Sequence, residues 1–304
     1  MNDYQSVREG GAGLIDLSAS RSRIRVTGSE AVMFLNGLIT NDMKSVVEGQ
    51  WLPAVFPTVQ GRLIGAVRIT GDKDSGFLID TENASHEAIL KTISRFTLAG
   101  DFRVADVTQE TALLTVQGRR ASEIIGNTDF QTIRATHTGE DGYDLLVEGN
   151  ASPVKEKLIN AGAQLVSPET FEILRIEAGI PRYGIDMDET NVVLETNLDD
   201  AISYTKGCYL GQEIIVRIKH RGHVAKKLTG MKFDAPVAAG AMVQSGEGKE
   251  IGRVTSVTFS PKLETTIALG YVRYEFLPAG TAVKAGDVTG TVTDLPFVRG
   301  SWHE

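Results

Sequence analysis

The sequence predicts an α+β region followed by a small all-β domain, and three observations support this prediction. The chain has 304 residues, and at about 150 residues per domain this length favours two domains, with one to three possible. As far as about residue 226, short strand-like stretches alternate with helices that carry start and stop signals. From Leu228 onward, short β-rich pieces alternate with turns that contain Gly or Pro, and no helix signal appears, as in a small barrel or sandwich. The first region is long enough to form two lobes.

The first elements already show the alternation of strand and helix. Residues 23–26 alternate polar and apolar side chains, which predicts a half-buried strand. Thr27 and Glu30 have the spacing of a capping box, so a helix is expected to begin there. The buried face of this helix would carry Val32, Leu35 and Ile39.

Further elements follow in the same manner. Apolar runs predict strands at 51–56, 63–69, 77–79, 102–104, 112–116 and 143–147. A helix is expected at about 85–95, and two more are expected where Ser152 and Ser167 each stand as a capping residue before a proline. The second of these helices would end near Ala178, ahead of Pro181. The β-rich pieces of the C-terminal domain are 253–259, 266–272, 281–283 and 289–293.

Composition limits the classes of function. The 31 Lys and Arg residues against 39 Asp and Glu residues give a net charge of −8, so direct binding of nucleic acid is not expected. The single cysteine allows neither an internal disulfide nor a four-cysteine metal site. No apolar run approaches the roughly 18 residues of a membrane span, and no signal peptide is recognisable at the start. A cytoplasmic protein without membrane partners is therefore expected.

Common site motifs do not occur in the chain. There is no G-x-x-x-x-G-K-[ST] or G-x-G-x-x-G phosphate loop and no G-x-S-x-G nucleophile elbow. His220 and His223 have a spacing that could chelate a metal, but cations surround them and no carboxylate lies among them. A positive environment opposes a metal ion, so no metal site is predicted.

The basic strip, residues 217–227, is unusual because the whole protein is acidic. One interpretation is a solvated cationic hairpin or helix end, which is what runs of charge usually form. The other is a docking site for an anionic ligand or partner. The sequence alone leaves both open.

Glu177 falls at the edge of the apolar side of the helix that follows Ser167. A carboxylate in that position costs free energy unless it is paired. It could make a structural hydrogen bond or an ion pair with a neighbouring arginine. It could instead face a pocket and accept paired N–H donors from a heterocycle, which is the interpretation we favour.

Cys208 lies in the segment Lys206–Glu213, K-G-C-Y-L-G-Q-E. A lone intracellular cysteine is commonly a small buried hydrophobe. Here glycines that permit an exposed tight turn flank the thiol, and Lys206 stands two residues away, where a cation favours the thiolate. A reactive thiol is therefore a second interpretation.

This segment resembles the K-G-C-[YF]-x-G-Q-E signature of the YgfZ-type folate-binding proteins, relatives of the glycine-cleavage T-protein (aminomethyltransferase). The likeness continues into Arg217 and Arg221. Four further segments resemble the wider superfamily in the right order, namely 34–42, 138–142, 175–181 and 254–261. The resemblance therefore spans nearly the whole chain.

The resemblance implies a ring of three lobes around a central tetrahydrofolate site. Two ferredoxin-like α+β lobes would comprise residues 1–48 with 110–226 and residues 49–109, and a β-barrel would comprise 227–304. The cofactor would be tetrahydrofolate or a one-carbon derivative of it, and its anionic tail would give the basic strip a purpose. The implied folate-binding residues are Asn41, Asp42, Glu177, Tyr209, Gln212, Glu213, Arg217 and Arg221, and the implied catalytic residues are Cys208 and Lys206.

One departure separates the subfamilies. T-proteins have a segment that resembles G-G-x-x-D-D-L, and this chain has Gly61–Val67 at that place. Gly65 and Ala66 therefore stand where the T-protein pattern has its two aspartates. A T-protein needs an acid there to handle a proton, so aminomethyl transfer is not expected. The resemblance then implies a folate-binding accessory protein for iron–sulfur cluster assembly or repair and some tRNA thiomethylation, with iron–sulfur enzymes or their assembly factors as partners. The alternatives are a folate-dependent one-carbon transferase and a folate-sensing scaffold in which Cys208 is structural.

Overall fold

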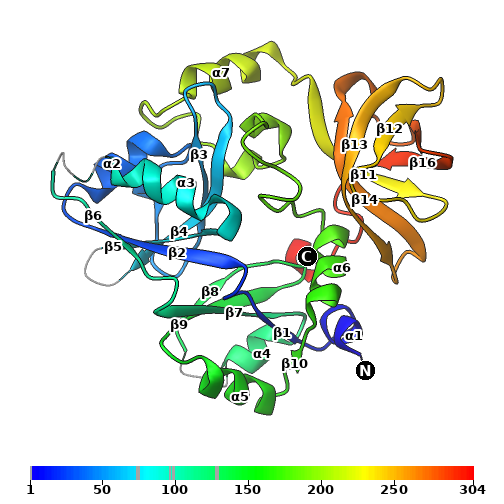
Figure 1. The fold of residues 1–304 in the computed structure, drawn as a ribbon. Helices are drawn as coiled ribbons and strands as arrows, with labels where there is room; N and C mark the ends of the chain where they lie inside the picture. The colour runs from blue at the N-terminus through cyan, green and yellow to red at the C-terminus, as the bar shows by residue number, and fades with distance from the viewer. Residues whose placement is uncertain (1, 73–75, 96, 98–99, 127–129) are drawn as a thin grey trace.

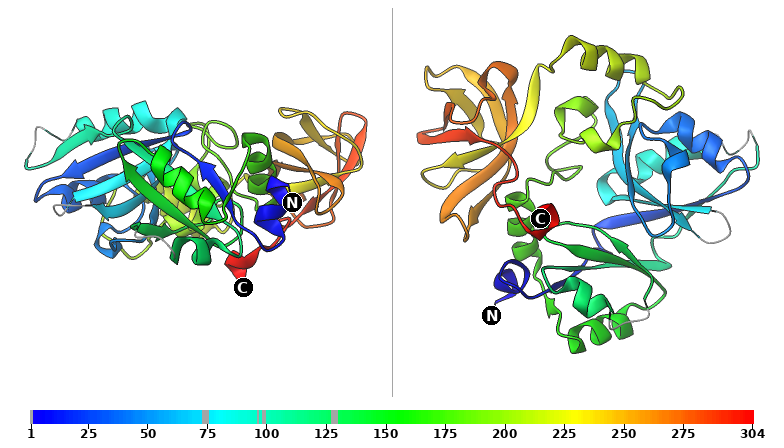
Figure 2. Two further views of the ribbon diagram at one scale, coloured as in Figure 1. Left: turned by 90° about the horizontal axis from the view of Figure 1, so that it is seen from below. Right: turned by 180° about the vertical axis from the view of Figure 1, so that it is seen from behind.

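The computed structural model describes residues 2–72, 76–95, 97, 100–126 and 130–304, and these form three lobes arranged as a ring (Figure 1). Two lobes combine a sheet with helices, and the third is a closed β-barrel. The view from behind shows the same three lobes around a common centre, and the view from below sees the ring edge-on (Figure 2). The predicted α+β class with a C-terminal barrel is confirmed.

The first lobe has a five-stranded sheet of order β10-β1-β7-β9-β8. Its strands are β1 (Gly13–Asp16), β7 (Thr111–Gln117), β8 (Thr132–Arg134), β9 (Gly142–Glu148) and β10 (Gln164–Leu165). Its helices are α1 (Asp3–Arg8), α4 (Ala121–Gly126), α5 (Ser152–Asn160) and α6 (Pro168–Glu177). Apolar residues of α4 and α5 form one core with the sheet, and those of α1 and α6 form another with the same strands.

The second lobe has a five-stranded antiparallel sheet of order β3-β4-β5-β2-β6. Its strands are β2 (Arg21–Thr27), β3 (Leu52–Pro57), β4 (Leu63–Asp72), β5 (Gly76–Glu82) and β6 (Arg103–Asp106), and its helices are α2 (Ala31–Leu38) and α3 (Asn83–Ser94). The core lies between the helices and the sheet, with Leu35, Ile39, Ile89 and Ile93 fully buried.

The barrel closes in the order β11-β14-β13-β12-β15-β16. Its strands are β11 (Lys226–Phe233), β12 (Met242–Ser245), β13 (Glu250–Ser260), β14 (Thr265–Arg273), β15 (Ala282–Ala285) and β16 (Val288–Thr293). Helix α7 (Gln212–Arg221) precedes the barrel and lies across the top of the ring in Figure 1.

The sheets divide the chain differently from the predicted lobes. Residues 21–48 were expected with the first lobe, but β2 pairs with β5 and β6 of the second sheet, and α2 packs on that sheet. Residues of the segment 183–215, also expected in the first lobe, share a core with Val55 and Leu63 of the second. The boundary differs from the prediction because the chain passes from the first sheet to the second directly after β1, so the next strand, β2, already belongs to the second lobe.

The predicted helix signals had mixed outcomes. Ser167 caps α6 as expected, since its hydroxyl accepts the backbone N–H of Thr170. The capping box predicted for α2 is wrong, because Glu30 accepts a backbone N–H from Asp101 instead. Helix α5 includes Ser152, and its N-cap is Ala151.

Candidate functional site: a cavity at the centre of the ring

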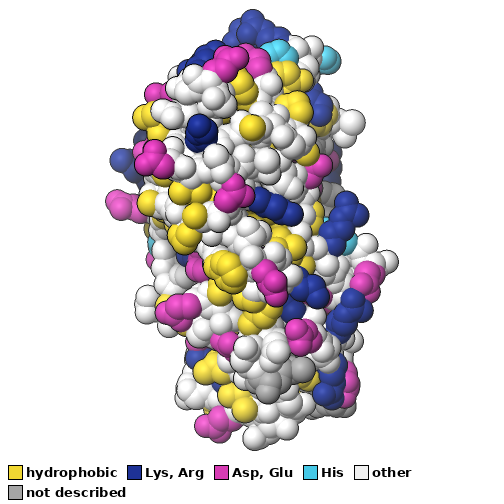
Figure 3. Space-filling view, turned by 90° about the vertical axis from the view of Figure 1, so that its right-hand side faces the viewer, with side chains coloured by type: hydrophobic (Ala, Val, Ile, Leu, Met, Phe, Trp, Pro, Cys, Tyr) yellow, Lys and Arg dark blue, Asp and Glu magenta, His cyan; other side chains and the backbone are white. Residues whose placement is uncertain are grey.

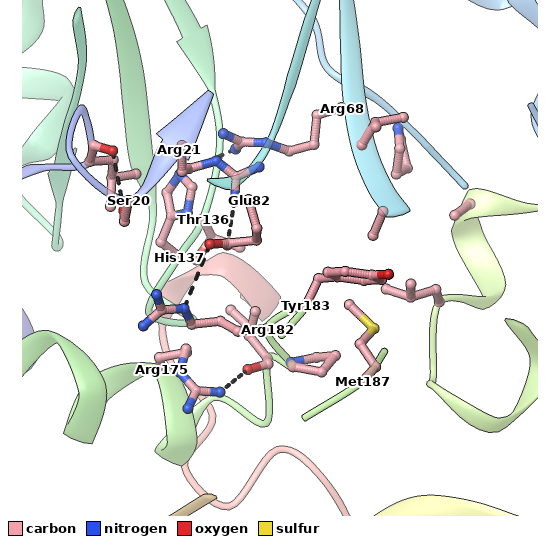
Figure 4. Close-up of a pocket in the computed structure, with 18 of the residues that line it drawn as sticks. Ser20, Arg21, Arg68, Glu82, Thr136, His137, Arg175, Arg182, Tyr183 and Met187 are labelled. Carbon is pink, nitrogen blue, oxygen red and sulfur yellow. Dashed lines mark hydrogen bonds and ion pairs between the residues drawn. The ribbon is translucent and has the colours of Figure 1, made fainter. Parts of the chain in front are cut away.

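A cavity of about 300 Å³ opens where the two α+β lobes meet the segment that leads away from α6. The second lobe contributes an apolar wall that includes Pro53, Ala54, Ala66 and Val67. Figure 4 shows Arg21, Glu82 and Arg182 on one side of the cavity, and Tyr183 and Met187 on the other. The cavity is thus apolar with a few charged groups at its edge, as is typical of small-molecule sites.

A chain of ion pairs fixes the charged edge. Asp80 is fully buried and lies 2.6 Å from Arg21 and 2.6 Å from Arg68. Arg21 also lies 2.6 Å from Glu82. Burial opposes the charge of Asp80, yet Arg21 and Arg68 lower the pKa of its carboxyl group below the usual value. The cations that line the cavity are therefore held in place before any ligand arrives.

Arg68 also joins the two sheets. Its guanidinium reaches from β4 to the fully buried Asp144 of β9, at 2.8 Å, and lies 4.7 Å from the ring centroid of Trp51. The indole N–H of Trp51 donates to the same carboxylate at 2.9 Å. His137, which lines the cavity, lies 2.9 Å from the other oxygen of Asp144.

Arg175 connects the cavity to the barrel. Only 1% of its side chain is exposed, and it lies 2.8 Å from Asp186 and 2.8 Å from Glu172. It also donates to the hydroxyl of Ser256 on β13 at 2.9 Å. Glu172 pairs in turn with Arg182 at the cavity edge.

Asp200 supplies a second carboxylate to the cavity lining. Burial raises the pKa of its carboxyl group, and the neighbouring charge of Asp199 adds to the effect. No arginine, lysine or histidine of the described residues forms an ion pair with it. The backbone N–H groups of Asp200 and Ala201 also interact with this carboxylate, and the residue is exposed to solvent.

Glu177 lies outside the cavity lining. Its side chain is fully buried, lies 2.9 Å from Arg8, and accepts hydrogen bonds from the hydroxyls of Tyr4 and Ser260. Both carboxylate oxygens are thereby engaged, which is the structural alternative considered for this residue. Contact between Glu177 and a pterin stays a prediction, and the cavity carboxylates found here are Glu82 and Asp200.

Lys206 is buried and holds the motif segment against α2. Its ammonium donates to the carbonyls of Asn36, Ile39 and Asn41 at 2.7, 2.9 and 2.5 Å. Burial lowers the pKa of this group to about 8, although the charge of Asp42 acts in the opposite direction. All three donors are engaged, so none is left for the thiol of Cys208. A catalytic role for Lys206 stays a prediction without geometric support.

The remaining motif residues surround a turn that leads into α7. Cys208 is exposed, whereas Tyr209 is buried and its ring centroid lies 5.1 Å from the Lys206 ammonium. Gly211 has φ 77°, and a Cβ there would lie 2.3 Å from the carbonyl oxygen of Thr58, so this position requires glycine. Gln212 and Glu213 form the first turn of α7. None of these residues lines the central cavity.

Asn41 and Asp42 also have structural partners. The Asn41 amide donates to the carbonyls of Pro53 and Asp200, two residues that line the cavity. Asp42 caps a short 3₁₀ turn by accepting the backbone N–H of Lys44. Asn41 therefore helps to position the cavity wall through Pro53 and Asp200. Asp42 is the next residue in the sequence and is not part of the cavity lining.

Comparison with known proteins identifies the family. Residues 1–129 and 125–206 match the GCVT N-terminal domain, and residues 226–298 match the glycine cleavage T-protein C-terminal barrel domain. The chain belongs to the glycine-cleavage T-protein family.

Several members of the family cover most of this chain. An aminomethyltransferase of Rubrobacter xylanophilus is 29% identical over 330 residues, which is 98% of this chain and 86% of the relative. A chloroplastic protein of Arabidopsis thaliana, described as a transferase, is 27% identical over 95% of this chain and 72% of its own length. The crystal structure of aminomethyltransferase T from Bartonella henselae has 23% identity, a TM-score of 0.88 and coverage of 98% of this chain and 89% of its own, which shows the same fold.

The two positions that carry aspartates in the T-protein pattern have different surroundings here. Ala66 lines the cavity, so a carboxylate at this position would face a ligand. Gly65 faces α3, and a Cβ there would lie 2.6 Å from Ile89 and 2.7 Å from Ser85. An aspartate at position 65 would therefore require α3 to move.

Sequence reasoning missed most of the cavity lining, namely Arg21, Arg68, Glu82, His137, Arg175, Arg182, Tyr183 and Asp200. One usable signal was Asp144, a carboxylate inside the predicted strand 143–147, because a buried charge requires a partner. The partner comes from the other lobe, and no local pattern reveals it.

Two other features are absent from the described part of the chain. No group of three or more His, Cys, Asp or Glu side chains is arranged to hold a metal ion there. Among the same residues, no helix has the length and apolar character needed to cross a bilayer.

The basic strip forms the end of α7 and the turn before β11. Arg217, His220, Arg221 and His223 are exposed, and Lys227 lies 3.6 Å from Asp199. Figure 3 shows Lys, Arg and His side chains at the upper end of the face on the barrel side, the end at which α7 lies in Figure 1. A solvated helix end is thus observed, and its role in binding anions stays a prediction.

Charge reversal tests this role of the strip. We expect Arg221→Glu to weaken binding of a polyglutamylated tetrahydrofolate about fivefold, because one exposed ion pair contributes up to about 1 kcal/mol. The same change at the exposed Lys262 on the barrel is the control. Both affinities are measured by calorimetry at low and high salt, and salt should reduce the difference. Equal affinities for the two variants would leave the strip as solvated surface.

Proposed function

We propose that the chain binds tetrahydrofolate, or a one-carbon derivative of it, in the central cavity. The observation that carries this proposal is the cavity itself, which lies at the centre of a T-protein-family ring and combines an apolar wall with the carboxylates Glu82 and Asp200. A carboxylate can accept two N–H donors from a heterocycle, and arginines at the edge suit the anionic tail of a folate. The volume of about 300 Å³ is at the lower end for ligand pockets and suits the bicyclic ring.

Beyond binding, we propose an accessory role in iron–sulfur cluster assembly or repair of the YgfZ type, with Cys208 as the working thiol and iron–sulfur enzymes or their assembly factors as partners. The exposed position of Cys208 supports access by such a partner. One thiolate cannot hold a cluster that typically needs four protein ligands, so any cluster would be shared with the partner. The thiol lies outside the cavity lining, so bound folate would not contact Cys208 directly. Any effect of folate on the thiol would pass through the protein lobes that surround the cavity.

Calorimetry with tetrahydrofolate tests the binding proposal. We expect one site per chain with micromolar or tighter affinity, and at least a tenfold loss in Ala66→Leu, because the larger side chain fills the cavity. Ala238→Leu, at an exposed position on the barrel side, is the control and should bind like the wild-type protein. Full affinity in a folded Ala66→Leu protein would place folate elsewhere.

Thiol chemistry tests the role of Cys208. Because the residue is exposed, iodoacetamide should label it in the native protein nearly as fast as in urea. Cys208→Ala should fold and bind folate normally but fail to restore iron–sulfur enzyme activity in cells that lack the native protein. Full restoration by Cys208→Ala would leave the thiol without a role.

The alternative is aminomethyl transfer, which the aminomethyltransferase relatives favour. The cavity wall at Ala66 carries no acid, so we expect no folate-dependent glycine cleavage with the partner proteins of that system. Robust cleavage would support the alternative and would assign the proton transfer to Glu82 or Asp200.

A further inference from the structure

The side chains of His137 and Asp144 form a dyad at the cavity. Nε2 of His137 lies 2.9 Å from Oδ1 of Asp144, and Asp144 is fully buried while 11% of the His137 side chain is exposed. Trp51 and Arg68 hold Oδ2 of the same carboxylate at 2.9 and 2.8 Å. The carboxylate therefore has a fixed orientation, and so does the imidazole ring bound to it.

This geometry determines the tautomer of His137. Burial disfavours the charge of Asp144, yet His137 and Arg68 lower the pKa of its carboxyl group, so the group is ionised and only accepts hydrogen bonds. A nitrogen lone pair 2.9 Å from a carboxylate oxygen would be repelled, so Nε2 carries the proton. The 3.2 Å approach of Arg68 to Nε2 is then a contact between two donors that bind different oxygens of the same carboxylate, Arg68 at Oδ2 and His137 at Oδ1. In neutral His137, Nδ1 consequently bears the lone pair.

Nδ1 of His137 has no hydrogen-bond partner among the described residues, and the side chain lines the cavity (Figure 4). The other charged groups of the lining near the dyad are Arg21, Arg68, Glu82 and Arg182, and each already has an ion-pair partner. Nδ1 is therefore an oriented acceptor whose natural partner is an N–H group of a ligand. Asp144 fixes this polarity and acts as a positioning residue.

We propose that His137, oriented by Asp144, makes the cavity selective for the reduced form of a pterin. Reduction converts ring nitrogens of the pyrazine half from acceptors into N–H donors, while the rest of the molecule keeps its hydrogen-bonding groups. An acceptor such as Nδ1 can accept a hydrogen bond from a ring N–H of the reduced pterin. In the oxidised pterin the same ring nitrogen presents a lone pair, which repels the lone pair of Nδ1. A site with a buried polar group discriminates strongly against a ligand that leaves the group unpaired. This inference rests on the proposed folate binding.

Calorimetry with tetrahydrofolate and with folic acid tests the selectivity. We expect the wild-type protein to prefer tetrahydrofolate at least tenfold, and His137→Phe to reduce that preference about tenfold by weakening tetrahydrofolate alone. His137→Gln, which retains an acceptor, should keep part of the preference, and Asp144→Asn should lose most of it. His86, which lies 3.2 Å from Asp106 and outside the cavity lining, provides a matched control in His86→Phe.

The NMR chemical shifts of the imidazole nitrogens report which nitrogen carries the proton. A change in protein stability alone would leave these shifts unchanged. In the ligand-free wild-type protein, His137 should show a protonated Nε2 and an unprotonated Nδ1, and Asp144→Asn should remove that bias. A protonated Nδ1 in the wild-type protein, or a selectivity that His137→Phe leaves unchanged, would overturn the inference while folate binding stands. Failure of the wild-type protein to bind either folate would overturn the proposed function and this inference together.

Discussion

Glu177→Ala should lower the free energy of unfolding by about 3–5 kcal/mol, because it leaves the guanidinium of Arg8 buried without one of its carboxylates. The side chain of Arg8 is 3% exposed, and among the described residues Glu140, at 2.9 Å, is the ion-pair partner that it retains. The hydroxyls of Tyr4 and Ser260 lose their acceptor in the same variant. Urea denaturation at neutral pH measures the change.

Glu169→Ala is the matched control for this variant, since Glu169 is an exposed acid in the first turn of the same helix, α6. Its loss should cost less than about 1 kcal/mol, the range of helix-dipole effects. If folded Glu177→Ala is as stable as the control but no longer binds tetrahydrofolate, the residue belongs to the ligand site after all.

Lys206→Met should lower the free energy of unfolding by about 2–5 kcal/mol, because three carbonyls at the end of α2 lose a charged donor together. The methionine side chain has a similar length, so the loss reflects hydrogen bonding more than packing. Thermal and urea unfolding should agree. Lys262→Met, at an exposed position on the barrel, should change stability by less than about 0.5 kcal/mol.

The same variant addresses the thiol. Because the Lys206 ammonium has no donor free for Cys208, the rate of iodoacetamide labelling of Cys208 should be unchanged in folded Lys206→Met. A labelling rate several times slower, with stability preserved, would show that Lys206 activates the thiol and would restore the catalytic role predicted for it.

The sequence predicted the class of the fold well because hydrophobic periodicity and turn residues are local signals. Ser167 illustrates this, since its cap depends only on a residue three positions away. Helix α7 was not predicted as a helix, because its exposed face carries the basic strip and only Ile215 is fully buried. The lobe boundary was misplaced because it depends on which strands pair, and pairing is not local.

The candidate site was less predictable for the same reason. Periodicity placed Glu177 at the edge of a buried face, but its partners Arg8 and Ser260 lie 169 and 83 residues away in sequence. The motif residues 206–213 gave the strongest resemblance, and they build a turn and a helix start outside the cavity. The cavity lining itself is spread over the two lobes and the segment after α6, so only the folded chain brings it together.

The contact of Arg68 with Asp80 on its own sheet and with Asp144 on the other has a consequence for how the molecule comes apart. Separating the two α+β lobes would leave Asp80 with Arg21 and Arg68 of its own sheet, but it would take Arg68 and Trp51 away from the buried carboxylate of Asp144. We therefore expect partial opening along this seam to be scarce in the native ensemble, and we expect the amide hydrogens of both sheets to exchange in one cooperative event. A molecule with three lobes in outline should thus unfold across this seam as one cooperative unit.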